Sequence, residues 1–147
     1  MNKYIEKYWP LVSSILICIV ILNLSGQYLD INSIANALNQ NTVSICVTLL
    51  GFFLTILTII QAIDNSAMRY IREVKEMSRI YHYLKRAIQF NAIATLSCLI
   101  LGILNTNLLG DNLQYILNII FIFIVLMALS TSVRFVYIFL SIIKSED

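Results

Sequence analysis

Four long stretches without a charged residue constrain this chain more than any other feature. They occupy about residues 9–25, 42–63, 87–108 and 112–133. An α-helix rises about 1.5 Å per residue, so about 20 such residues cross a hydrocarbon core about 30 Å thick. Charged residues make up only 12% of the chain, about half the share found in soluble domains. The sequence therefore predicts an all-α, polytopic membrane protein with four transmembrane helices in a single domain, residues 1–147.

The first uncharged stretch also has features of a secretory signal, because it follows the short basic start Met1-Asn2-Lys3. The region after it, "NLSGQYLD", offers no small-x-small cleavage site, and Gln27 stands where a lipoprotein signal would need a cysteine. We therefore expect this stretch to be retained as a spanning helix.

The positions of lysine and arginine predict the orientation of the spans. Basic residues are found before the first span, between the second and third, and after the fourth, whereas the two remaining connections contain none. Basic connections favour the cytoplasmic side of a membrane. This alternation predicts both termini in the cytoplasm, with a cytoplasmic connector at 64–86 and a C-terminal cytoplasmic helix extension at 134–147.

The connections carry helical patterns of their own. In the connector, apolar residues recur every three or four positions from Ala67 to Ile88, and neither glycine nor proline interrupts them. We expect a helical connector with one bend. In the first outer connection, "DINSIANALNQN" has Asp30 or Asn32 as a candidate cap, and it predicts a short amphipathic helix on the outer membrane surface. Trp9 and Pro10 are expected at the headgroup level, with the proline in the first helical turn.

Small and polar residues form a stripe along each of the two central spans. The stripe of 42–63 consists of Ser44, Thr48, Gly51, Thr55, Thr58 and Ala62, and that of 87–108 of Asn91, Thr95, Cys98, Gly102 and Asn105. In both stripes the spacing alternates between four and three residues, which is close to the 3.5-residue period of a left-handed helix pair. Helices in lipid associate through close approach at small residues and through interhelical hydrogen bonds.

Two interpretations of the stripes remain open at the sequence level. In the first, the two stripes pack against each other within one chain, with an amide pair between Gln61 and Asn91 and another between Asn105 and Asn118. In the second, the polar line of Thr55, Thr58, Gln61 and Asn91 borders a hydrated path in a homo-oligomer.

Catalytic and transport chemistry is not indicated. No Asp, Glu, Lys or Arg lies near the middle of a predicted span, although proton-coupled transporters typically need an intramembrane carboxylate. No metalloprotease motif, phosphate-binding glycine loop or nucleophile–base pair is present. Cys18, Cys46 and Cys98 lie inside spans without CxxC spacing, and we expect them to be small buried hydrophobes. We therefore expect no enzyme activity, no cofactor, no metal and no direct contact with nucleic acid.

The connector is the candidate recognition segment. Its basic residues are Arg69, Arg72, Lys75, Arg79, Lys85 and Arg86. One interpretation is a solvated face that satisfies the preference for positive charge inside. The other is a docking surface for anionic lipid headgroups or a cytoplasmic protein partner. His82 lies among tyrosines in "RIYHYLKR", and we expect it to be solvated or interfacial rather than a proton switch.

The stretch "TLLGFFLTILTI", the basic connector ending in "YLKRAI" and the polar third span together resemble small four-span bacterial membrane proteins of anti-phage systems. The nearest types are the membrane subunit of the Kiwa system and four-span pore-forming effectors, and the resemblance covers roughly Thr42 to Leu104. It implies a homo-oligomeric inner-membrane protein that senses membrane disturbance, or permeabilises the membrane when a cytoplasmic partner triggers it. The competing expectation is a small homo-oligomeric ion channel or transporter subunit.

Overall fold

The computed structural model of the chain describes residues 3–25, 30–62, 76–103 and 110–144. This part of the chain is helical, and its long helices are α1 (Lys3–Leu24), α2 (Ile31–Ala62), α4 (Glu76–Ile103) and α5 (Asp111–Lys144). The predicted all-α class is therefore confirmed. Three of these helices contain stretches long and apolar enough to cross a membrane, Ile31–Thr58, Ile80–Ile103 and Asp111–Ser141, and a fourth apolar stretch, Tyr8–Leu24, is shorter.

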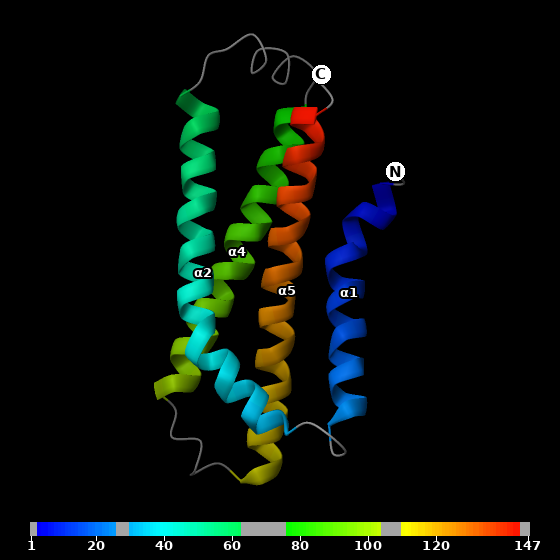
Figure 1. The fold of residues 1–147 in the computed structure, drawn as a ribbon, viewed down its shortest axis with the longest axis vertical. Helices are drawn as coiled ribbons and strands as arrows, with labels where there is room; N and C mark the ends of the chain where they lie inside the picture. The colour runs from blue at the N-terminus through cyan, green and yellow to red at the C-terminus, as the bar shows by residue number, and fades with distance from the viewer. Residues whose placement is uncertain (1–2, 26–29, 63–75, 104–109, 145–147) are drawn as a thin grey trace.

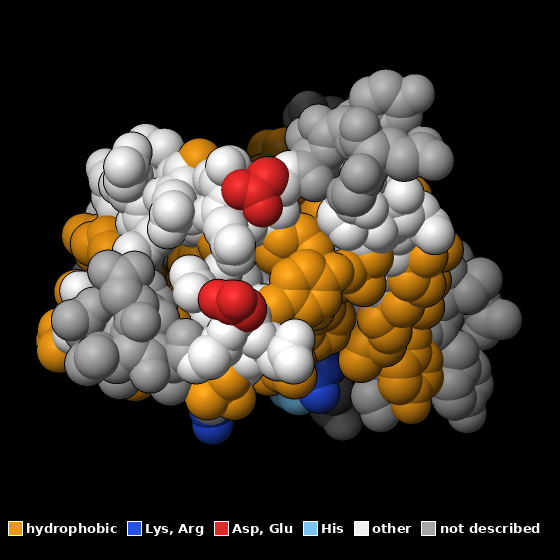
Figure 2. Space-filling model, turned by 90° about the horizontal axis from the view of Figure 1, so that it is seen from below, with side chains coloured by type: hydrophobic (Ala, Val, Ile, Leu, Met, Phe, Trp, Pro, Cys, Tyr) orange, Lys and Arg blue, Asp and Glu red, His pale blue; other side chains and the backbone are white. Residues whose placement is uncertain are grey.

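The helices run alternately up and down. In Figure 1, α1 and α4 point one way and α2 and α5 the other. The start of α1, the end of α2, the start of α4 and the end of α5 therefore share one end of the bundle, here called the terminal end. Figure 2 looks onto the opposite end, where acidic side chains lie at the surface.

Helix α5 is the centre of the bundle. It packs against α1, α2 and α4, and α2 also packs against α4. Helix α5 is mostly apolar throughout its 34 residues. Its large buried side chains include Phe121, Ile122 and Phe135. A helix that is apolar on all sides suits this position, because its neighbours cover several of its faces.

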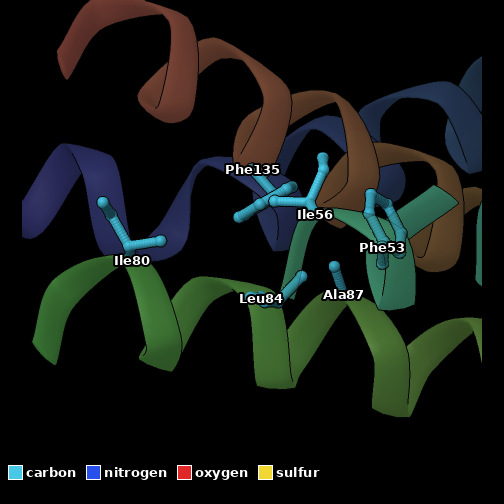
Figure 3. Close-up of a cluster of buried hydrophobic side chains, with 6 residues drawn as sticks. All are labelled: Phe53, Ile56, Ile80, Leu84, Ala87 and Phe135. Carbon is cyan, nitrogen blue, oxygen red and sulfur yellow. The ribbon is translucent and has the colours of Figure 1, made fainter. Parts of the chain in front are cut away.

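The core consists of three clusters stacked along the bundle. At the terminal end, Phe53 and Ile56 of α2 meet Ile80, Leu84 and Ala87 of α4 and Phe135 of α5 (Figure 3). The buried residues of the middle cluster are the small Cys46, Ala94 and Ala128, and the half-buried Phe90 and Ile124 pack against them. At the opposite end, Ile31 and Ala35 of α2 pack with Cys98, Phe121, Ile122 and Val125. Small side chains in the middle let three helices approach closely there.

Helix α2 begins earlier than expected: the segment predicted as a short amphipathic helix is helical, but it continues into the following span instead of ending before it. Residues 31–41 are the first part of α2, which bends in its first third (Figure 1). Neither glycine nor proline separates this part from the following span, so nothing ends the helix. Its apolar face is buried against α5, and Asn118 Nδ2 donates to Asn32 Oδ1 at 2.9 Å.

Asp30 caps this helix, as the sequence suggested. Its carboxylate accepts hydrogen bonds from the Ser33 hydroxyl and from the backbone N–H groups of Asn32 and Ser33. The Ser33 hydroxyl first, and then the backbone N–H groups, lower the pKa of the Asp30 carboxyl. At pH values above the ordinary carboxyl pKa, the ionised Asp30 cap therefore stabilises the helix. This stabilisation is lost as the pH falls through the lowered pKa.

Helix α1 lies at the edge of the bundle and is attached through α5. Its helix starts at Lys3, so Pro10 lies inside the helix and the expectation of a first-turn proline is wrong. Figure 1 shows α1 changing direction in its first part, as a proline inside a helix produces. The hydroxyls of Ser13 and Ser14 lie 3.3 and 3.2 Å from Ser130 Oγ of α5.

Candidate functional site: the outward face of α2 and a basic cleft

The small-residue stripe of α2 faces away from the bundle. Its members Ser44, Thr48, Gly51, Thr55 and Thr58 are all exposed. A Cβ added at Gly51 would meet nothing within 4 Å, so the space in front of the stripe is open. For Gln61, the structure describes only the helix and not the side chain.

The threonine hydroxyls of the stripe are satisfied within their own helix. Thr48 donates to Ser44 O at 2.7 Å, Thr55 to Gly51 O at 2.9 Å and Thr58 to Thr55 O at 2.8 Å. Such bonds let a hydroxyl sit in lipid without an unsatisfied donor. This face therefore presents small side chains and hydroxyl oxygens that can accept hydrogen bonds. The threonine protons are donated within α2.

A second stripe with the same period packs α2 into the bundle. Cys46, Phe53 and Ile56 are buried, and Leu49 packs against the cluster that contains Phe53 and Ile56. At about 100° per residue, these four positions lie on average about 160° around the helix from the small-residue stripe. The interpretation that the two polar stripes pack against each other within one chain is therefore wrong for the described residues of α2, because the apolar stripe occupies that interface.

The stripe of α4 does face the bundle over part of its length. Asn91 and Cys98 are buried, Thr95 is half-buried and Gly102 is exposed, whereas Asn105 lies outside the described residues. The Cys98 thiol hydrogen-bonds Asn39 of α2. The predicted amide pairs involving Gln61 and Asn105 fall on side chains that the structure does not describe.

Asn91 is the most buried polar group between α4 and α5. It is 0% exposed. Its Nδ2 donates to Ala87 O and to Ser132 Oγ, both at 2.8 Å. The Ser132 hydroxyl in turn donates a hydrogen bond to Ala128 O at 2.7 Å. The Asn91 Oδ1 atom is buried and has no hydrogen-bond partner among the described residues.

The described basic residues of the connector differ in their surroundings. Lys85 is exposed and Arg86 is half-buried. Arg69, Arg72 and Lys75 lie outside the described residues, and for Arg79 only the helix is described. His82 is exposed and its ring packs edge-on against Tyr83, with centroids 5.8 Å apart.

A cleft of about 320 Å³ opens between α1, α4 and α5. The sequence interpretation missed it, because its walls come from three helices. It is lined by Tyr8, Pro10 and Leu11 of α1, by Tyr83, Arg86, Gln89 and Phe90 of α4, and by Met127, Thr131 and Arg134 of α5. The volume lies in the range of small-ligand pockets, roughly 300–1,000 Å³.

Arg134 is the buried cation of this cleft. It is 7% exposed, and its guanidinium carbon lies 4.1 Å from the centroid of the Tyr83 ring. A guanidinium over an aromatic face is held by cation–π attraction. The contact joins α4 to α5 beside Arg86, so two arginines line one space. The spacing of Met127, Thr131 and Arg134 on one face of α5 was the sequence signal available for it.

The described residues offer no metal centre. No group of three or more His, Cys, Asp or Glu side chains in this part of the chain is placed to hold a metal ion. Cys18, Cys46 and Cys98 are free and buried, which confirms the interpretation of the cysteines as buried residues.

Comparison with protein-family models, with curated proteins and with solved structures found no match to this chain. The class of the protein therefore follows from its helices: an all-helical protein with three helices long and apolar enough to span a membrane.

Proposed function

We propose that the protein is a non-enzymatic, multi-pass protein of a bacterial cytoplasmic membrane that assembles as a homo-oligomer through the outward stripe of α2. Both termini lie in the cytoplasm, and the first apolar helix provides the fourth crossing. The protein acts as a membrane sensor or effector of an anti-phage defence system, coupled to a cytoplasmic partner through residues 64–88.

The exposed stripe is the observation that supports assembly. From Ser44 to Thr58 it runs along 15 residues of α2, and the two ends are about 21 Å apart along the helix axis. Leucine-like side chains would suit contact with lipid tails equally well, so lipid exposure alone does not account for an aligned row of small residues. Small residues instead let a second helix approach closely, and close approach is what associates helices in a bilayer.

The sensor or effector role is supported by the resemblance to small four-span defence proteins and by the basic connector. An interface of small residues is held mainly by close packing here, because the threonine protons are already donated within α2. Association of this kind is weak enough to change with the state of the membrane. The partner is expected at the basic residues of the connector, because they are most of the positively charged residues of the chain.

A channel is the second candidate, and the same stripe motivates it. The hydroxyl oxygens of Thr55 and Thr58 keep free lone pairs, because their protons are donated to the helix backbone. In an oligomer whose α2 helices surround a central space, these oxygens would face water.

Bulk added to the stripe tests the assembly. The double variant Thr55→Leu/Thr58→Leu is expected to lower the association constant of the oligomer at least about tenfold and to shift the protein toward monomer. The reason is that the leucines keep the two helix backbones apart. The control adds bulk beside the stripe, with Val47→Phe and Leu54→Phe, two residues that are 53% exposed. Size-exclusion chromatography with light scattering in mild detergent measures the result. An unchanged oligomer in the double-leucine variant, or equal loss in the control, would refute the proposed interface.

Expression of the same variants with a dye for membrane potential separates the two candidate functions. Depolarisation without any partner indicates a constitutive channel, whereas depolarisation only with the partner present indicates a gated sensor or effector.

A further inference from the structure

We infer that the cleft between α1, α4 and α5 binds the phosphate headgroup of an anionic phospholipid from the leaflet at the terminal end. This inference goes beyond the proposed assembly, because none of the described residues that line the cleft lies on α2.

The cleft is at headgroup depth. Helix α5 begins at Asp111, and Arg134 follows 23 residues later. At about 1.5 Å per residue this separation is about 35 Å, which exceeds a hydrocarbon core of about 30 Å. If Asp111 marks one surface of the membrane, Arg134 reaches the headgroups of the other. Arg86 lies at the same level, since its neighbour Tyr83 contacts Arg134.

All three helices change from apolar to polar in the same direction along the cleft. On α5, Met127, Thr131 and Arg134 follow each other on one face toward the terminal end. On α4, Phe90 is followed toward that end by Arg86, and on α1, Leu11 is followed by Tyr8. A phospholipid has this same polarity, with acyl chains inward and phosphate outward. A free anion would need only the polar half.

The charge of the cleft suits a phosphate. Its described lining contains two arginines and no Asp or Glu. Guanidinium groups bind phosphate through paired N–H donors, and the Tyr8 hydroxyl and the Gln89 amide are further polar groups of the lining. Basic pockets between transmembrane helices on the cytoplasmic side are known to take anionic headgroups. Zwitterionic lipid is disfavoured, because its ammonium group would approach the same two cations.

Binding of phosphatidylglycerol to the purified full-length protein in detergent tests the inference, with phosphatidylcholine as the reference lipid. Native mass spectrometry is expected to show about tenfold tighter binding of phosphatidylglycerol, in line with one charge-assisted hydrogen bond. Arg86→Gln is expected to remove this preference, and Arg86→Lys to retain part of it. Lys85→Gln is the matched control, because it removes the same charge from the exposed neighbour and is expected to change binding less than about twofold.

Three results would overturn the inference: no preference for phosphatidylglycerol in the parent protein, equal losses in Arg86→Gln and Lys85→Gln, or displacement of the lipid by millimolar inorganic phosphate. The last result would assign the cleft to a free anion. Circular dichroism confirms that each variant is folded. The oligomeric state of the same samples is measured as well. This measurement distinguishes a loss of lipid binding at the cleft from a loss of assembly through the α2 interface.

Discussion

The Phe53→Ala variant is expected to lose about 3 kcal/mol of unfolding free energy, at the lower end of the cost of removing a buried phenylalanine. Phe53 is 0% exposed, and its ring meets Phe135 edge-on, with centroids 5.3 Å apart. It also packs between α2 and α4 in the cluster with Ile56 and Leu84 (Figure 3). In lipid the transfer of an apolar group contributes little, so the loss comes from vanished contacts and the cavity left behind.

The adjacent Phe52 provides the control. It is 51% exposed, and Phe52→Ala is expected to change the unfolding free energy by less than about 0.5 kcal/mol in the detergent-solubilised monomer. Titration of each protein with sodium dodecyl sulfate in mixed micelles, followed by far-ultraviolet circular dichroism, measures both values. Similar losses at the two positions would contradict the packing of α2 through its apolar stripe.

Asn91→Asp is expected to destabilise the bundle by about 3 kcal/mol or more, because it places a carboxyl group at a buried position between helices. The substitution replaces the Nδ2 donor by an oxygen that faces Ala87 O at about the distance of the present 2.8 Å bond. It also removes the donor to Ser132 Oγ. Two oxygens at that distance repel each other unless the carboxyl group carries a proton.

Two further variants isolate the cause of this effect. Asn91→Thr has almost the same volume and can donate to Ala87 O, as Thr95 donates to Asn91 O. It is expected to cost less than about 1 kcal/mol, the usual size of one interhelical hydrogen bond. Asn112→Asp adds the same charge in the exposed first turn of α5, where a helix favours negative charge. The same denaturant titration applies, and a large loss in Asn112→Asp would assign the effect to net charge instead of burial.

The helices themselves were predictable, because long uncharged runs require them. The continuation of α5 past Arg134 to Lys144 follows the expected helix extension. The join between residues 31–41 and the following span was missed, although the absence of a glycine or proline was visible in the sequence. Amphipathic character was read as a membrane-surface helix, whereas the apolar face of this segment is covered by α5.

The site was harder to predict, for a reason that α2 makes clear. This helix carries two stripes of the same period on opposite faces, one small and polar and one apolar. Periodicity identifies both stripes, but only the packing of α4 and α5 determines which stripe turns inward. The basic cleft was missed for a related reason. Tyr8, Arg86 and Arg134 lie on three helices, and their proximity depends on how these helices rotate and align.

Disulfide cross-linking along α2 tests the central claim, assembly through the outward stripe, most directly. Cysteine is introduced singly at three stripe positions, Thr48, Thr55 and Thr58, and at two off-stripe positions, Val47 and Leu54. Each variant is compared in native membranes with the parent chain, whose three cysteines are buried. The account predicts cross-linked dimers for the three stripe positions and little for the other two. Equal yields at all five positions, or none at the stripe, would contradict it.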